Sequence, residues 1–285
     1  MTFQRPQVMG VVNVTPDSFS DGGLFLNLEE ALLHAQQLTK EGATILDIGG
    51  ESTRPGAQRV SIQDEIDRVV PVIRAIKDSD WFASAAERGS APLISVDTMN
   101  SQTATAAVSA GADIVNDVSG GLADPAMFAA VAPTTARYIL SHWRGHSQQM
   151  DNLNQYEDIA ADVVAEISEQ LAIAVANGIS RDRVIVDPGL GFAKDLSQNW
   201  QLVARLDKLE SLGLPVLVGA SRKRFIAGVL DSEDPASVDN GRRDLATAVL
   251  TALLLQRKLW GVRVHNVQAT VDAIKLVEAL QVAGK

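Results

Sequence analysis

The chain of 285 residues contains no cysteine. It therefore cannot form a disulfide, bind zinc through thiolates or use a cysteine nucleophile. Aromatic residues make up only 5% of the chain, so a core has to be built from alanine, valine, leucine and isoleucine. The first six residues lack the apolar stretch of a secretory signal, and no segment is apolar for long enough to span a membrane. We expect a cytoplasmic protein.

Basic residues are also in the minority. The 25 lysines and arginines face 35 aspartates and glutamates, which gives a formal net charge of -10. Nucleic acids and anionic membranes repel such a chain, so we expect neither of them as a partner. A cleft with a local excess of positive charge is still compatible with this total.

One arrangement recurs along the chain. A short β-branched run ends in a polar residue or a glycine, and an amphipathic helical stretch follows. Near-continuous apolar strands are typical of a parallel sheet that helices cover. The eight runs are Val8 to Asn13, Thr44 to Asp47, Leu93 to Asp97, Ile114 to Asp117, Arg137 to Leu140, Arg183 to Asp187, Pro215 to Gly219 and Val262 to His265. They follow one another at intervals of about 36 residues, which suits one strand and one helix.

Eight such units predict an α/β fold, a (β/α)8 TIM barrel that forms a single domain over residues 1–285. A doubly wound sheet with an appended helical region is the alternative. An internal echo favours the barrel, because residues 42–50 resemble residues 111–118. In both segments a glycine ends a helix, and a polar residue marks the exit of the strand that follows.

The stretches between the runs are expected to be helices or surface connections. Apolar residues recur three or four positions apart from Ile62 to Ile73 and from Ile159 to Leu171, which predicts amphipathic helices. The polar segments from Asp78 to Ala91, Ser141 to Tyr156 and Asp231 to Gly241 are expected to be surface connections.

In barrels of this kind the active site lies at the carboxyl-terminal ends of the strands. Polar residues occupy these ends: Asn13, Asp47, Asp97, Asn116, Asp187, Lys223, Arg263 and His265. Carboxylates and amides can pair with the edges of a heterocycle, and cations can bind a phosphate. Each single aspartate could equally cap a helix, and Asp47 could instead support its neighbours. Further cations predict a locally positive mouth: Arg54, Arg59, Arg222 and Arg224.

Longer motifs make this interpretation specific. The run MGVVNVTPDSFSDGG from Met9 to Gly23 and the run DIGGESTRPGA from Asp47 to Ala57 resemble the first two signatures of the dihydropteroate synthase family. Shorter matches follow in order: SVDT, VNDVSGG, DPGLGF, VGASRK and RVH. The resemblance implies a (β/α)8 enzyme of folate synthesis. Such an enzyme joins 6-hydroxymethyl-7,8-dihydropterin diphosphate to p-aminobenzoate and releases diphosphate and 7,8-dihydropteroate.

The resemblance also implies roles for single residues. The pterin would be bound by Asp97, Asn116, Asp187 and Lys223, with Phe192, Gly219, Ser221 and Val264 also against substrate. The diphosphate would be bound by Asn13, Arg263 and His265, with Mg2+ reached through Asn13. Phe19, Thr53, Arg54 and Pro55 would enclose p-aminobenzoate, and sulfonamides are expected ligands. The expected catalytic residues are Asp97, Lys223, Arg263 and His265, since Asp97 could stabilise a pterin cation.

Two alternatives stay open at this point. A related barrel transfers methyl from methyltetrahydrofolate to a corrinoid protein, but it would need neither the Ser-Thr-Arg-Pro-Gly run nor a basic pair in the last strand. A paralogue that binds pterin without catalysis would usually have lost the first two loops, which are intact here. Arg224 replaces a serine that is common in the family, and His142 ranks below the other site residues. The family further implies a homodimer.

Overall fold

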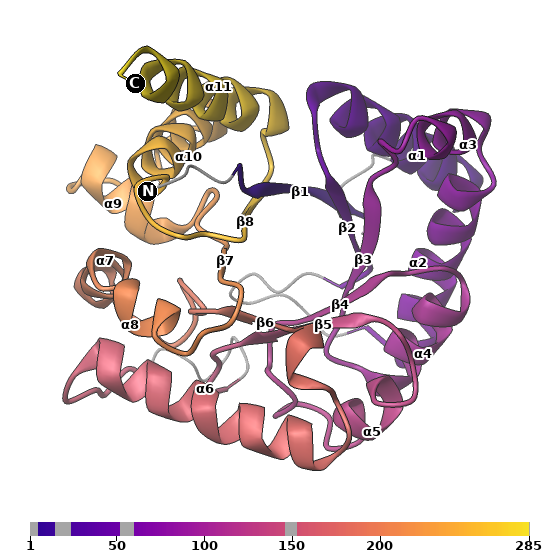
Figure 1. Ribbon diagram of the computed structural model, residues 1–285, viewed down its shortest axis with the longest axis horizontal. Coiled ribbons are helices and arrows are strands. Elements are labelled where there is room, and N and C mark those ends of the chain that lie inside the picture. Colours follow the sequence, from indigo (N-terminus) through magenta and orange to yellow (C-terminus); the bar gives the residue numbers. More distant parts are fainter. Residues whose placement is uncertain (1–4, 15–23, 52–59, 146–152, 285) are drawn as a thin grey trace.

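The computed structural model describes residues 5–14, 24–51, 60–145 and 153–284. Within them, eight parallel strands surround a central axis, and helices surround the strands (Figure 1). The strands are β1 (Gln7–Asn13), β2 (Ile45–Gly49), β3 (Leu93–Asp97), β4 (Ile114–Asp117), β5 (Arg137–Ser141), β6 (Val184–Asp187), β7 (Leu217–Val218) and β8 (Gly261–Val264). The predicted (β/α)8 barrel is confirmed.

The helices follow the strands along the chain. They are α1 (Leu24–Glu41), α2 (Ile62–Lys77), α3 (Asp80–Glu87), α4 (Ser101–Ser109), α5 (Met127–Val131), α6 (Ile159–Ala176), α7 (Leu196–Ala204), α8 (Asp207–Glu210), α9 (Arg224–Leu230), α10 (Asn240–Leu254) and α11 (Val267–Ala283). A short 3-10 helix (Arg181–Arg183) precedes β6. Within the described ranges, no helix is long and apolar enough to cross a membrane.

The seam between β6 and β7 closes the barrel with the fewest contacts. Strands β1 to β6 pair in sequence order, and β8 lies between β1 and β7. Across the seam the described strands form one bridge, between Val186 and Val216, and the Val186 N–H donates to the Pro215 carbonyl oxygen at 2.9 Å. Of the predicted run from Pro215 to Gly219, Leu217 and Val218 form the strand and Val216 forms the isolated bridge.

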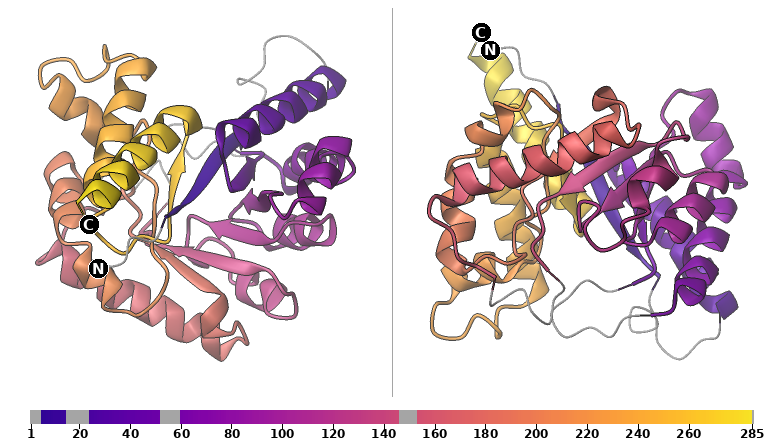
Figure 2. Two further views of the ribbon diagram at one scale, coloured as in Figure 1. Left: turned by 45° about the horizontal axis from the view of Figure 1, so that its top comes forward. Right: turned by 90° about the horizontal axis from the view of Figure 1, so that it is seen from below.

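Alternating side chains along the strands separate two hydrophobic cores. Outward-pointing residues such as Val8 and Val12 pack against the helices, which cover the outside of the barrel (Figure 2). Inward-pointing residues form a second cluster: Met9, Ile45, Ile114, Ile139, Ile185 and Leu217. This apolar cluster fills the barrel at the amino-terminal side. On β2, β4, β5 and β6 the next inward position, one step nearer the mouth, is polar: Asp47, Asn116, Ser141 and Asp187.

Both predicted amphipathic helices are confirmed, as α2 and α6. The buried face of α2 carries Val69, Val72, Ile73 and Ile76, whereas Ile62 at its start is 36% exposed. The connection from Asp231 to Gly241 is confirmed up to the start of α10. Part of the connection from Ser141 to Tyr156, namely 146–152, lies outside the described residues.

One predicted surface connection is wrong, because the segment from Asp78 to Ala91 contains helix α3. The Ser79 hydroxyl caps this helix by accepting a hydrogen bond from the Phe82 N–H at 3.4 Å. The Lys77 ammonium lies 4.9 Å from the centre of the Phe82 ring, and Ala85 is buried. Polar residues on both sides of the helix concealed it, although a serine before it is a common N-cap signal.

Candidate functional site

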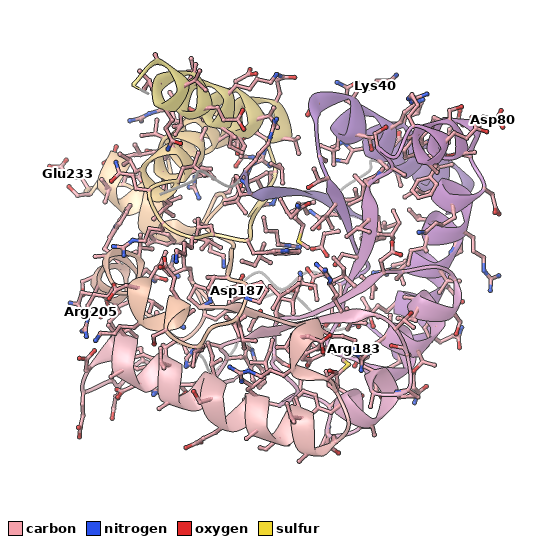
Figure 3. All side chains as sticks on the ribbon, viewed as in Figure 1. Lys40, Asp80, Arg183, Asp187, Arg205 and Glu233 are labelled. Carbon is pink, nitrogen blue, oxygen red and sulfur yellow. The ribbon has the colours of Figure 1, made fainter. Side chains whose placement is uncertain are left out.

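The strand-end residues predicted from the sequence meet inside the mouth of the barrel. The register places Asn13, Gly49, Asp97 and Asn116 in one row across β1 to β4, because each pairs with the next. Figure 3 shows Asp187 near the barrel centre, whereas Lys40, Asp80 and Glu233 lie at the periphery. Inward alternation and this register bring the side chains of several strands to one site.

Arg263 on β8 contacts two buried carboxylates, Asp47 on β2 and Asp97 on β3. Its Nε donates to Asp47 Oδ2 at 2.6 Å, and its Nη2 donates to Asp97 Oδ2 at 2.7 Å. Asn116 Nδ2 donates to the same Asp47 oxygen at 3.1 Å. The Asp47 residue is 0% exposed, whereas the Arg263 side chain is 22% exposed. Asp47 is therefore a support for Arg263 and Asn116, as one of the two interpretations of the sequence proposed.

The Gly49 backbone leaves room for side chains from both neighbouring strands. A Cβ at this position would lie 3.7 Å from Asp97 Oδ2 and 3.8 Å from Asn13 Oδ1. Because Asp97 Oδ2 also accepts from Arg263, the amide of Asn13 and the guanidinium approach the same region of the mouth. The anion site at the junction of β8 and β1 stays a prediction.

The pKa of Asp97 is raised to about 7. Burial is the largest cause, and the negative charge of Asp47 nearby raises the pKa further, whereas the positive charge of Arg263 lowers it. Burial lowers the pKa of Arg263, but Asp47 and Asp97 outweigh it, so the pKa lies above its ordinary value. The guanidinium thus stays charged, while the Asp97 carboxyl changes protonation near neutral pH. A carboxyl in this state can accept or donate a hydrogen bond.

A second pair of opposite charges lies at the ends of β6 and β7. Both Asp187 Oδ2 and the Lys223 ammonium lie within 4.0 Å of the point that a Cβ on Gly219 would occupy. The Gly189 N–H donates to Asp187 Oδ1 at 2.7 Å, and the Lys223 ammonium lies 4.7 Å from the centre of the Phe192 ring. Burial raises the pKa of Asp187 and lowers the pKa of Lys223 to about 8.

The segment after β7 holds three consecutive polar residues in fixed directions. The Ser221 hydroxyl lies 2.9 Å from the ring atom Nδ1 of His265, and it accepts a hydrogen bond from the backbone N–H of His265 at 3.2 Å. Arg222 has a left-handed backbone, with φ of 59°, and its guanidinium donates to both oxygens of Asp244 at 2.7 Å. The Lys223 ammonium donates to the Leu190 carbonyl oxygen. Asp244 thus neutralises Arg222. The expectation that Arg222 adds positive charge to the mouth is wrong.

Val264 is the predicted site residue that the structure removes from the mouth. It is 1% exposed, and its side chain belongs to the core between strands and helices. The alternation of β8 explains this, since Arg263 and His265 on either side of it point inward. Five predicted residues lie outside the described residues: Phe19, Thr53, Arg54, Pro55 and Arg59.

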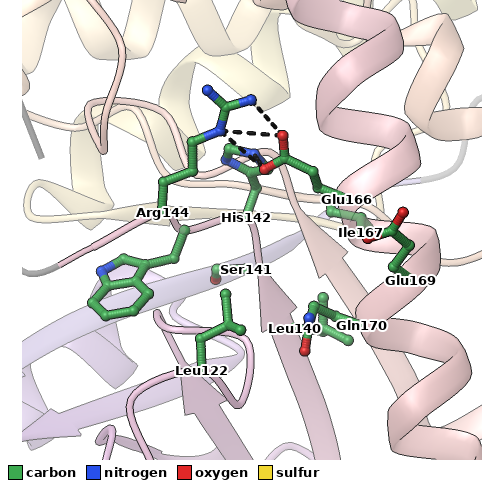
Figure 4. A pocket seen from close by; sticks show the side chains of 10 residues that line it. Leu122, Leu140, Ser141, His142, Arg144, Glu166, Ile167, Glu169 and Gln170 are labelled. Carbon is green, nitrogen blue, oxygen red and sulfur yellow. Dashed lines mark hydrogen bonds and ion pairs between the residues drawn. The ribbon is translucent and has the colours of Figure 1, made fainter. Parts of the chain in front are cut away.

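A pocket of about 230 Å³ lies apart from the strand-end cluster, on the outer side of β5 (Figure 4). It is lined by Leu140 and Ile167 from the helix-facing core, by Trp143 after β5, and by the polar α6 residues Glu166, Glu169 and Gln170. Its polar residues continue into a buried cluster around His142 and Lys194. Sequence reasoning missed Lys194, although a lysine inside an otherwise buried glycine-rich segment was a usable signal.

Comparison with known proteins adds an independent line of evidence. Residues 9–265 match the family model described as pterin binding enzyme. The dihydropteroate synthase of Mycobacterium leprae is 44% identical over 285 residues, which cover 100% of this chain and 96% of that protein.

Two solved structures are similar over nearly the whole chain. The dihydropteroate synthase of Xanthomonas albilineans with 4-aminobenzoic acid has a TM-score of 0.85 at 41% identity, covering 99% of this chain and 95% of that one. The Yersinia pestis enzyme in a sulfonamide complex has a TM-score of 0.85 at 40% identity, covering 97% and 94%.

The raised pKa of Asp97 predicts how stability depends on pH. The folded state binds this proton more tightly than the unfolded chain, so its stabilising effect is lost as the pH rises through about 7. Between pH 5 and pH 8, the unfolding free energy of Asp97→Asn should therefore fall less than that of the wild type. We expect a difference of more than about 1 kcal/mol, since one pKa unit corresponds to about 1.4 kcal/mol.

Urea unfolding at both pH values measures this difference. Asp272→Asn is the matched control, because the Asp272 side chain is 55% exposed on α11. Equal pH dependence in wild type and Asp97→Asn would show that the fold does not retain the Asp97 proton.

Proposed function

The chain belongs to the pterin binding enzymes and, among them, to the dihydropteroate synthases, and on this premise we propose a function for each part of its site. It joins 6-hydroxymethyl-7,8-dihydropterin diphosphate to p-aminobenzoate, with release of diphosphate and 7,8-dihydropteroate. The observation that carries the proposal is the pairing of buried carboxylates with cations at the mouth, Asp97 with Arg263 and Asp187 near Lys223.

The pterin ring is bound by the polar groups that point inward from β3, β4 and β6. The carboxylates of Asp97 and Asp187 accept hydrogen bonds from the ring N–H groups, while Asn116 and Lys223 donate to its acceptor atoms. A heterocycle that satisfies these groups replaces the water that they would otherwise need. A ligand without matching donors would leave buried carboxylates unpaired, which gives the site its specificity.

The diphosphate faces Arg263, His265 and Asn13. The reaction breaks the C–O bond to the diphosphate and forms a C–N bond to the aryl amine, which loses a proton. The Arg263 guanidinium lowers the barrier because it is already oriented toward the charge that grows on the leaving group. Ser221 fixes the His265 ring through Nδ1, and Asp47 fixes the Arg263 guanidinium through Nε.

Mg2+ fits this site through Asn13. The described residues contain no cluster of three or more histidine, aspartate or glutamate side chains that could enclose a metal ion. Mg2+ commonly binds through one or two protein oxygens together with substrate phosphates, so the Asn13 amide oxygen and a diphosphate suit it. When bound, Mg2+ would neutralise charge on the diphosphate.

The p-aminobenzoate site is assigned to Phe19, Thr53, Arg54 and Pro55, all outside the described residues. We extend sulfonamide binding to this chain from its similarity to the Yersinia pestis enzyme. We also place the protein in the cytoplasm. A multiply charged diphosphate does not enter a lipid bilayer, so the enzyme has to share a compartment with the source of its substrate.

A diphosphate-release assay tests the proposed function. Release should require pterin diphosphate, p-aminobenzoate and Mg2+ together, and chelation of the metal should reduce it to the background rate. Release without p-aminobenzoate would indicate hydrolysis instead. Absence of release from a protein that still binds pterin diphosphate would contradict the synthase function.

We propose a homodimer that forms through the helices next to β7 and β8. These helices carry apolar side chains that are at least half exposed: Val229 on α9, Leu245, Val249 and Leu253 on α10, and Leu276, Leu280 and Val282 on α11. Leu245, Val249 and Leu253 are four residues apart and so share one face of α10. Helices α10 and α11 pack together on one side of the barrel (Figure 1), so this face fits a second copy of the same face.

Light scattering after size exclusion measures the mass of the assembly. The wild type should have twice the 30.4 kDa of the chain, and Leu245→Glu/Leu253→Glu should be monomeric. Ile173→Glu on α6 is the control, because Ile173 is 45% exposed and α6 packs on β5, away from α10 and α11. A monomeric wild type, or a dimer that survives the double substitution, would contradict the proposed interface.

A further inference from the structure

A buried lysine lies at the centre of the segment between β6 and α7. Lys194 is 8% exposed, and its ammonium has three acceptors within hydrogen-bond distance. It donates to the carbonyl oxygens of Gly189 and Phe192, each at 3.0 Å, and lies 2.8 Å from His142 Nδ1. Three acceptors match the three donors of an ammonium group. Such a group is costly to bury without them, so this arrangement is a built feature of the fold.

The segment that Lys194 holds has an unusual backbone. Gly189, Gly191 and Ala193 have positive φ values of 65°, 78° and 48°. A Cβ on Gly189 would lie 2.0 Å from the His142 carbonyl oxygen, so the segment lies directly against the end of β5. Left-handed conformations cost free energy at residues other than glycine, and surrounding bonds have to maintain them. The ammonium supplies bonds on both sides of the turn.

The same segment carries groups of the pterin site. Asp187 lies two residues before Gly189, to which Lys194 donates. The Leu190 carbonyl oxygen accepts a hydrogen bond from Lys223, and the Lys223 ammonium lies over the Phe192 ring. The Lys194 bonds end on Gly189 and Phe192, which flank Leu190. Movement of this turn would therefore displace the Asp187 and Lys223 groups together.

His142 connects the ammonium to α6. Its Nε2 lies 2.9 Å from Glu166 Oε2, while Nδ1 faces the Lys194 ammonium. Because the Glu166 carboxylate only accepts, Nε2 has to carry the proton, and Nδ1 accepts from Lys194. Burial lowers the pKa of Lys194, but three acceptors around its nitrogen require three N–H donors, which only the ammonium form has. Burial and the neighbouring Lys194 lower the pKa of His142 to about 4, which agrees with a neutral ring. Figure 4 shows His142 and Arg144 both directed at Glu166, with Arg144 Nε 3.0 Å from Oε2.

We propose that Lys194 is a positioning residue for pterin binding, and that His142 and Glu166 fix its direction. Arg144 anchors Glu166, Glu166 orients the neutral His142 ring, and that ring accepts one of the three Lys194 hydrogen bonds. The other two hold the turn that presents Asp187 and receives Lys223. This inference rests on the proposed function, because it assigns the pterin to that side of the mouth.

Lys194→Met tests the proposal, since methionine keeps the apolar stem and removes every donor. The dissociation constant of pterin diphosphate, measured by calorimetry, should rise about tenfold or more, because hydrogen bonds to a charged group are lost. At saturating pterin diphosphate, KM for p-aminobenzoate and kcat should stay within about threefold of wild type, since those contacts remain. Lys208→Met is the control, because Lys208 is exposed on α8.

Two His142 variants keep the test decisive if Lys194→Met does not fold. His142→Gln can still accept from Lys194 and donate to Glu166, whereas His142→Leu can do neither. Pterin affinity should be close to wild type in His142→Gln and about tenfold weaker in His142→Leu. Amide hydrogen exchange of the peptide spanning 187–195 should be faster in Lys194→Met and His142→Leu, without any ligand.

The outcomes separate the inference from the function on which it rests. A wild type that does not bind pterin diphosphate contradicts the proposed function. In that case the exchange measurement still tests whether Lys194 holds the turn between β6 and α7. Unchanged pterin affinity and unchanged exchange in Lys194→Met would overturn the inference. So would equal weakening of both substrates, which would indicate a general loss of structure.

Discussion

The contact of the Arg263 guanidinium with two buried carboxylates is the interaction on which the rest of the site depends. Asp47 is inaccessible to solvent and Asp97 nearly so, and a carboxylate in such a place is stable only with a partner. Arg263 reaches both across the barrel, from β8 to β2 and β3. The contact therefore ties the last strand to the first half of the barrel, and at the same time it directs a positive charge toward the mouth.

The apolar cluster below this contact explains why the charges are in the mouth. Residues such as Met9, Ile45 and Ile185 fill the amino-terminal side of the barrel, and the inward positions two residues further along β2 and β6 are Asp47 and Asp187. The interior of the barrel thus changes from apolar to ionic over two residues of these strands. This change excludes water from one side of the charges and leaves the other side open to a ligand. Low polarizability around the charges strengthens each contact and raises the pKa of Asp97.

Much of this arrangement was predictable, and the exceptions have physical causes. The strand-end residues, the barrel and the neighbourhood of β1 and β8 follow from alternation, because period two fixes which residues point inward. The same rule should have removed Val264 from the site, since it lies between two inward residues. The partners of Arg222 and Lys194 could not be predicted, because Asp244 and His142 come from distant segments that only the closed barrel brings near. Helix α3 was missed because the polar residues on both sides of it outweighed its apolar centre and its cap.

The central claim is that Arg263 serves the diphosphate as well as the fold, and Arg263→Lys tests it most directly. Lysine keeps a positive charge in the mouth, but it cannot bridge Asp47 and Asp97 with a planar group. Calorimetry with free pterin and with pterin diphosphate separates the two roles. We predict that Arg263→Lys weakens binding of pterin diphosphate at least about tenfold more than binding of free pterin, because loss of an oriented donor acts on the anion. Equal weakening of both ligands would contradict the account and leave Arg263 with a structural role alone.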